Sequence, residues 1–223
     1  MVRYYTDVHR TRRNGEGFRI AYTADGVSFK HVDSFDEVPA GPGDRLFVDT
    51  IPLSHTDGVL ELVRRGVEVY YLRRLTMIKK AREELKLPKT ARGDIEALMT
   101  IEDRWFRRVT EDFLVMRRMI AAYRSLLRTH QQLLNKYKAL SEAERNVLRP
   151  AIKSLEEQMY ALAKQIAMEA GKRYPAYNML VERLGIGDSV SGREALAELL
   201  TYADFASSPL RGLKRLMGLY RPV

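Results

Sequence analysis

Apolar residues recur alternately three and four positions apart over residues 106–137, and this spacing restricts the possible folds more than any other feature. The positions are Phe106, Val109, Phe113, Met116, Ile120, Tyr123, Leu127, His130, Leu134 and Tyr137. A seam of this length lines one face of a long helix and is typical of a coiled coil. We therefore predict that the helical period begins after Ile95. The lone His130 on this seam is expected in a core or interface rather than as a metal ligand.

A second apolar stripe follows a predicted bend at residues 139–140. Ser141 and Glu144 have the spacing of a capping box, which predicts a new helix start. Pro150 is expected to interrupt that helix, because proline removes a backbone donor. The stripe then continues toward Gly171 through Ile152, Leu155, Met159, Leu162 and Ile166. Two stripes joined by a short connection predict an antiparallel helical hairpin over 99–172, with faces left for a homodimer or higher homo-oligomer.

The first 98 residues have shorter periods, typical of an α/β domain. Strands are predicted at Val2–Thr6, Phe18–Thr23, Val27–Val32, Leu46–Val48 and Val67–Leu72, and helices at Thr56–Arg65 and Lys79–Leu87. Asn14-Gly15 is a strong hairpin-turn signal, so the first three strands are expected to form an antiparallel meander. A meander followed by strand, helix and strand is the order of ribonuclease H-like domains, in which acids cluster at the ends of adjacent central strands.

Three acids stand where such a domain carries its metal site. Asp7 and Asp49 each directly follow an apolar run, and Asp94 lies at the start of a helix within Lys89–Leu98. An Asp at a helix N-terminus also has a structural explanation, because it caps free amides and complements the helix dipole. The chain has no cysteine, so a bound metal is expected to be a hard cation held by oxygen. The three acids together predict a Mg²⁺ or Mn²⁺ site, with Asp7 bridging two ions and Asp49 and Asp94 each completing one.

The charge balance favours a polyanionic partner. The chain has 38 Lys and Arg against 29 Asp and Glu, a net charge of +9. Nucleic acid is the leading candidate, and a merely well-solvated basic protein is the alternative. Phosphate contacts are predicted at Arg10, Arg12, Lys89 and Arg92. Further arginines are expected on the polar face of the first long helix, either on phosphate or paired with acids as a solvated flank: Arg104, Arg107, Arg108, Arg117, Arg118, Arg124 and Arg128.

The remaining segments bear on the cellular location of the protein and predict a second phosphate-binding site. No apolar run approaches the roughly 20 residues that span a bilayer, and the N-terminus lacks a signal-peptide hydrophobic region, so a cytoplasmic protein without a membrane partner is expected. The C-terminal piece, 173–223, is predicted to be a small helical domain. In it, Gly185-Ile186-Gly187 is expected to form a turn between helices whose amides of Gly185 and Gly187 face a phosphate.

Taken in order, these motifs resemble the insertion-sequence transposases with a RuvC-like DEDD catalytic domain, the IS-one-ten family. Four segments carry the resemblance: Tyr5-Thr6-Asp7-Val8-His9, then Phe47-Val48-Asp49, then Lys89-Thr90-Ala91-Arg92-Gly93-Asp94-Ile95, and finally Gly185-Ile186-Gly187 with Gly218-Leu219-Tyr220-Arg221-Pro222. The resemblance implies a ribonuclease H-like domain at 1–98, a coiled-coil insertion at 99–172 and a transposase-like C-terminal domain at 173–223. It further implies metal-dependent cleavage of DNA during transposition or recombination, with DNA and, as a second candidate, a guide RNA as partners.

The sequence also departs from the family pattern. Asp49 replaces a glutamate, and Ala91 stands where the family has one of its two closing aspartates. The family's nucleophilic serine follows the Gly-Leu-x-Pro signature, beyond Val223, so serine-mediated strand transfer is expected to need another polypeptide. Three acids still suffice if Glu96 or Asp57 turns inward.

The sequence therefore supports three functional hypotheses. The first is a metal-dependent nuclease or recombinase-like enzyme. The second is a transposase-derived, catalytically inactive oligomer that binds DNA or RNA, which the loss of an acid at Ala91 favours. The third is a purely structural oligomer, and it leaves the positions of the three acids unexplained.

Overall fold

The computed structural model describes residues 1–10 and 18–203, which divide into two compact units between Leu114 and Val115. The predicted Asn14-Gly15 turn, Arg12 and the C-terminal signature from Phe205 onward lie outside the described residues. The three-part division at 98 and 172 is finer than these two units and stays a prediction. The described residues belong to an α/β plus α class, as the sequence predicts.

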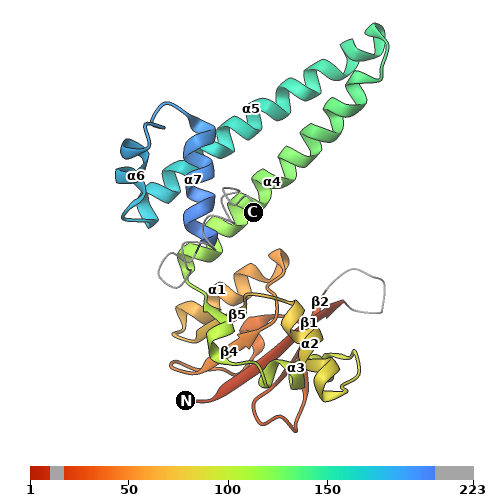
Figure 1. The fold of residues 1–223 in the computed structure, drawn as a ribbon, viewed down its shortest axis with the longest axis vertical. Helices are drawn as coiled ribbons and strands as arrows, with labels where there is room; N and C mark the ends of the chain where they lie inside the picture. The colour runs from red at the N-terminus through yellow and green to blue at the C-terminus, as the bar shows by residue number, and fades with distance from the viewer. Residues whose placement is uncertain (11–17, 204–223) are drawn as a thin grey trace, which may run out of the picture. The chain divides into compact units, whose positions relative to one another are not determined.

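The first unit contains a six-stranded mixed sheet (Figure 1). Its strands are β1 (Arg3–Arg10), β2 (Phe18–Thr23), β3 (Lys30–Val32), β4 (Arg45–Val48), β5 (Glu68–Leu72) and β6 (Phe106–Arg108), in the order β3-β2-β1-β4-β5-β6. Strands β1, β4 and β5 are mutually parallel, and the other neighbouring pairs are antiparallel. The three parallel strands therefore end at the same edge of the sheet, which is where an α/β sheet usually carries its site.

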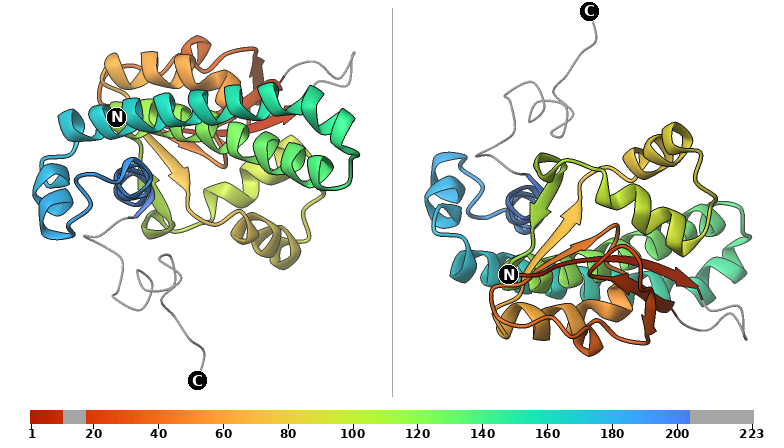
Figure 2. Two further views of the ribbon diagram at one scale, coloured as in Figure 1. Left: turned by 90° about the horizontal axis from the view of Figure 1, so that it is seen from above. Right: turned by 90° about the horizontal axis from the view of Figure 1, so that it is seen from below.

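Helices cover both faces of this sheet (Figure 2). The helical segments of the unit are η1 (Phe35–Glu37), η2 (Leu53–His55), α1 (Thr56–Arg64), α2 (Thr76–Leu85), α3 (Ala91–Met99) and η3 (Asp103–Trp105). Helix α1 lies against one face, and α2 and α3 lie against the other. Under α3, the Phe47 ring stacks between the rings of Tyr5 and Tyr70 at centroid distances of 5.1 and 5.3 Å. These aromatic side chains build the core directly beneath the edge that carries the acids.

Several predicted boundaries in this unit differ from the structure. Strand β1 does not end before Asp7 but continues to Arg10, because β2 pairs with it along this whole stretch. Strand β3 is limited to its last three residues, because Asp25 accepts amide hydrogen bonds from Val27 and Ser28 in a local turn. Helix α2 begins at Thr76 rather than Lys79.

The long helix α4 (Glu111–Lys138) starts later than predicted. Phe106 belongs to strand β6, where it pairs with Leu72 and lies edge-on against the Phe47 ring at 5.0 Å. The Val109 amide donates to the Val69 carbonyl at 2.8 Å, so it also extends the sheet. The three-residue spacing at the start of the seam therefore marks an edge strand rather than a helical turn.

The second unit is helical. It contains most of α4, then α5 (Glu142–Arg173), α6 (Tyr177–Arg183) and α7 (Val190–Tyr202). The predicted capping box at Ser141 and Glu144 is present, whereas Pro150 lies inside α5 and does not end it. Met116 and Ile120 of α4 pack with Ile166 of α5, and His130 Nε2 lies 3.1 Å from Glu156 Oε1, so the two helices lie side by side (Figure 1). Among the described residues, no helix combines the length and apolarity needed to cross a bilayer.

Candidate functional site

Asp7 and Asp49 occupy neighbouring positions on two adjacent parallel strands. The pairing of β1 with β4 ends at Thr6 and Val48, and each acid is the next residue. Because side chains two residues apart point to the same face of a strand, both acids share the face of Tyr5 and Phe47, which α2 and α3 cover. The side chain of Asp7 is nine-tenths buried there.

Asp94 reaches the same face from the first turn of α3, which packs against β1. The helix begins after Thr90, whose Oγ1 accepts a hydrogen bond from the Gly93 amide at 3.1 Å. Gly93 is buried against the Pro88 carbonyl, so a Cβ at this position would collide with that oxygen. The close approach fixes the start of α3, and with it the position of Asp94.

Arg82 of α2 is the residue of this site that the sequence analysis missed. Its Nε lies 3.0 Å from Asp94 Oδ1, and the two side chains are only 15% and 22% exposed. The contact is an ion pair without hydrogen-bond alignment, since neither atom has a hydrogen-bond partner among the described residues. One signal could have indicated Arg82: it stands four residues after Ile78, which puts it on the buried face of an amphipathic helix.

The site concentrates negative charge in a poorly solvated place. Burial raises the pKa of Asp7 to about 6, with repulsion from Asp94 adding to the shift and Arg82 opposing it. Burial and then repulsion from Asp7 raise the pKa of Asp49 to about 8, against the backbone amides of Thr50 and Val8. Burial also raises the pKa of Asp94, while Arg82 and Lys89 lower it. Asp7 and Asp94 therefore both raise the pKa of Asp49, and Asp94 raises that of Asp7.

His9 adds a nitrogen to this group. Its Nδ1 lies 3.6 Å from Asp7 Oδ2, and its ring meets the edge of the His31 ring at a centroid distance of 5.8 Å. Burial, followed by the positive charges of His31 and Arg19, lowers the pKa of His9. The lowered pKa favours the neutral imidazole, whose nitrogen can serve as a ligand beside the Asp7 carboxyl group.

The donor chemistry of the site fits a hard divalent cation, although the side chains are not gathered around one point. Asp49 Oδ1 is buried and has no hydrogen-bond partner among the described residues, which is costly unless a cation or proton satisfies it. Yet no group of three or more acidic or histidine side chains in residues 1–10 and 18–203 is close enough to hold a metal ion. The ion pair of Asp94 with Arg82 gives a physical reason, because it holds the third carboxylate on the guanidinium.

The predicted phosphate-binding residues have different surroundings. Lys89 is exposed, whereas Arg92 pairs with Glu96 at 2.7 Å and lies over the Phe29 ring at 4.9 Å, so Glu96 does not turn toward the acids. The side chain of Arg10 is not among the described groups, and Arg12 lies outside the described residues. The wider set of arginines is not one helical face, because Arg104, Arg107 and Arg108 precede α4.

The predicted turn at residues 185–187 does connect two helices, α6 and α7. Gly185 adopts a left-handed φ of 62°. Its amide donates to the Glu182 carbonyl at 3.1 Å, and the Ile186 amide donates to the Val181 carbonyl at 3.1 Å. The amides of Gly185 and Ile186 therefore hydrogen-bond to carbonyls of α6. Of the two glycine amides predicted to bind phosphate, only that of Gly187 stays a prediction.

Comparison with known proteins adds no relative. The sequence matches none of the protein-family models and none of the curated proteins with which it was compared.

Proposed function

We propose that the protein is a metal-dependent nuclease of the ribonuclease H-like type that cleaves DNA phosphodiesters in a transposase- or recombinase-like reaction. The observation that carries the proposal is the pair Asp7 and Asp49, neighbours on adjacent parallel strands, with Asp94 entering the same face from α3. The strand order β3-β2-β1-β4-β5, with an antiparallel meander followed by two parallel strands, supports this fold assignment. Acids on adjacent central strands are what such a domain uses to hold its divalent ions.

The chain's own groups have distinct roles in this reaction. Asp7 and Asp49 would hold Mg²⁺ or Mn²⁺, and Asp94 would join them when it leaves Arg82. A divalent ion in such a site activates water and stabilises the leaving oxygen of a phosphodiester. Lys89 and Arg92 at the start of α3 would bind phosphates on either side of the scissile bond, and a phosphate that attracts Arg82 would release Asp94.

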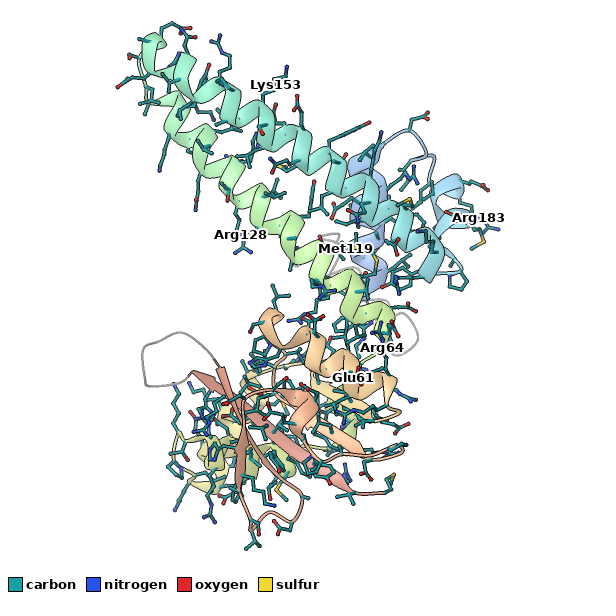
Figure 3. The ribbon with its side chains drawn as sticks, turned by 180° about the vertical axis from the view of Figure 1, so that it is seen from behind. Glu61, Arg64, Met119, Arg128, Lys153 and Arg183 are labelled. Atoms are coloured by element: carbon teal, nitrogen blue, oxygen red, sulfur yellow. The ribbon has the colours of Figure 1, made fainter. Side chains whose placement is uncertain are left out.

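The second unit fits a role in assembly. We propose that α4 and α5 form a helical hairpin that joins two chains as a coiled coil and presents a basic surface to DNA or a guide RNA. Arg128 and Lys153 point away from the helix pair (Figure 3). Exposed apolar side chains on the same helices, Leu127 and Tyr160 among them, are available to a partner chain.

An inactive nucleic-acid-binding oligomer is the second candidate function. Two observations favour it: Ala91 replaces an acid of the resembled family, and Arg82 already neutralises Asp94. This candidate predicts binding of nucleic acid without metal-dependent cleavage.

The test is cleavage of branched and duplex DNA in Mg²⁺ or Mn²⁺ by wild type, Asp7→Asn and Asp33→Asn. Asp33 is the matched control, since its side chain is 81% exposed in the same unit. We expect cleavage by wild type and Asp33→Asn and a loss of at least about 100-fold in Asp7→Asn, the scale of removing one group that stabilises charge in the transition state. Two results would reject the nuclease proposal. One is that Asp7→Asn still cleaves DNA, and the other is that wild type binds DNA but does not cleave it.

A further inference from the structure

A group of cationic and aromatic side chains lies along the same sheet edge as the acids. Tyr71 of β5 pairs with Val48, so Leu72 stands level with Asp49, and Leu72 in turn pairs with Phe106 of β6. The Arg73 amide donates to the Trp105 carbonyl at 3.0 Å, one step past that level. Trp105 therefore lies at the edge of the sheet where Asp49 follows β4, two strands away. Strands are about 4.8 Å apart, so the offset is about 10 Å.

Two guanidinium groups flank the Trp105 ring. The guanidinium carbons of Arg74 and Arg104 lie 5.6 and 5.7 Å from the ring centroid, within the range of cation–π contacts. The body of the indole packs partly buried against the core under α2 and α3, which fixes the ring. Arg74 has no ion-pair partner among the described residues, and Arg104 pairs with Glu102 while its side chain stays 70% exposed. The group therefore offers positive charge around a rigid aromatic surface.

We propose that Trp105, Arg74 and Arg104 form a binding site for an unpaired nucleotide, so that the substrate of the acidic site is single-stranded or locally unpaired nucleic acid. The inference rests on the proposed function for the acidic site and names its substrate class. A stacked base needs an aromatic face, and only an unpaired base can leave its own stack to reach one. The two arginines would hold the flanking phosphates.

A purely local role for the same contacts makes different predictions. In that case the arginines only cover the indole and stabilise the loop between β5 and β6, which is an ordinary role for surface cation–π pairs. Substitution of Trp105 would then lower stability without changing affinity for any nucleic acid.

The experiment uses the fact that the chain has a single tryptophan, so its fluorescence reports Trp105 alone. The full-length protein is titrated in EDTA with a short oligothymidylate and, separately, with a duplex of equal length. We expect the single strand to quench the fluorescence and to bind at least about 10-fold more tightly than the duplex. In fluorescence anisotropy with labelled single strand, Trp105→Leu is expected to weaken binding about 5- to 150-fold, the loss of one base stack. Trp105→Phe, which keeps an aromatic face and fills the same space, should retain most of the affinity.

The arginines are tested by the salt dependence of binding. Arg74→Gln is expected to reduce the slope of log affinity against log salt by about 0.7, one phosphate contact on a single strand. Arg64→Gln is the matched control: it also removes one exposed arginine of the same unit, but from α1 on the opposite face of the sheet, and should leave the slope unchanged.

Two results would overturn the inference: no change in fluorescence at saturating single strand, or equal affinities of wild type and a folded Trp105→Leu. Because these titrations contain no metal, they separate the two proposals. Quenching without any metal-dependent cleavage would reject the nuclease and leave this site standing. Cleavage that depends on Asp7 but not on Trp105 would reject this site and leave the nuclease standing.

Discussion

At the scale of single residues, burial decides the chemistry of the acidic site. Asp7 and Asp49 lie side by side on a face covered by helices. Burial raises the pKa of both, and Asp7 raises that of Asp49 further while Asp94 raises that of Asp7. Arg82 compensates Asp94 but only opposes part of the shift of Asp7. The result is a group of carboxyl groups that hold protons near neutral pH, so a cation that binds them is expected to displace those protons.

The raised pKa values predict that the protein loses stability as pH rises. With folded pKa values of about 6 for Asp7 and about 8 for Asp49, against about 3.9 in the unfolded chain, the native state holds protons that the unfolded state has released. Their contribution is therefore fully present below about pH 4 and is lost as pH rises through about 8. In EDTA, we expect the melting temperature measured by circular dichroism to fall across this window, and to fall less in Asp49→Asn. Equal pH slopes for the two proteins would contradict these pKa values.

Arg82 is predicted to stabilise the empty site by pairing with Asp94. Arg82→Gln leaves a half-buried carboxylate without its cation, so we expect a loss of about 2–3 kcal/mol in urea denaturation with EDTA, somewhat below the cost of breaking a fully buried pair. Arg92→Gln is the control on the same helix pair, because Arg92 is 65% exposed and its pair with Glu96 should contribute less than about 1 kcal/mol. The same loss in both variants would show that the Arg82 pair has no special role.

At the scale of elements, the sequence predicted those features that depend on local pattern. The bounds of β2, the capping box at Ser141 and the strand ending at Val48 were all predicted at their observed positions. Phe106 and Val109 were wrongly placed in a helix, because a spacing of three fits either element until the pairing with β5 is known. The contact of Arg82 with Asp94 depends on how α2 packs beside α3, which no local pattern encodes.

The start of α3 is predicted to tolerate no side chain at Gly93. A Cβ there meets the backbone carbonyl of Pro88, so Gly93→Ala must shift the helix start, and we expect a loss of about 1–3 kcal/mol in urea denaturation. Gly187→Ala is the control, because no atom lies within 4 Å of its Cβ position and its φ is not left-handed. It should change stability by less than about 1 kcal/mol. Equal effects of the two substitutions would contradict the close approach at Pro88.

At the scale of the whole molecule, the two units have different proposed roles. The first carries the acids and the cationic aromatic edge, and the second carries long helices with exposed apolar and basic side chains. The net charge of +9 suits a protein that holds nucleic acid with both parts.

Assembly through the long helices is predicted to give a dimer in solution. Leu127 belongs to the apolar seam yet is 44% exposed, and Val147 on α5 is 77% exposed. We expect sedimentation velocity to show a dimer, and Leu127→Glu to shift it toward monomer because a charge would be buried between chains. A monomer at every concentration measured would reject assembly by these helices.

The central claim is that Asp7 and Asp49 form a metal site, and the most direct test is Mn²⁺ and Mg²⁺ binding by isothermal titration calorimetry. Wild type, Asp7→Asn and Asp33→Asn are compared at a pH above about 8, where protons no longer compete for Asp49. We predict saturable binding by wild type and Asp33→Asn, with release of protons on binding at lower pH, and loss of binding in Asp7→Asn. Wild type that binds neither ion up to millimolar concentration, or Asp7→Asn that binds as wild type does, would contradict the account.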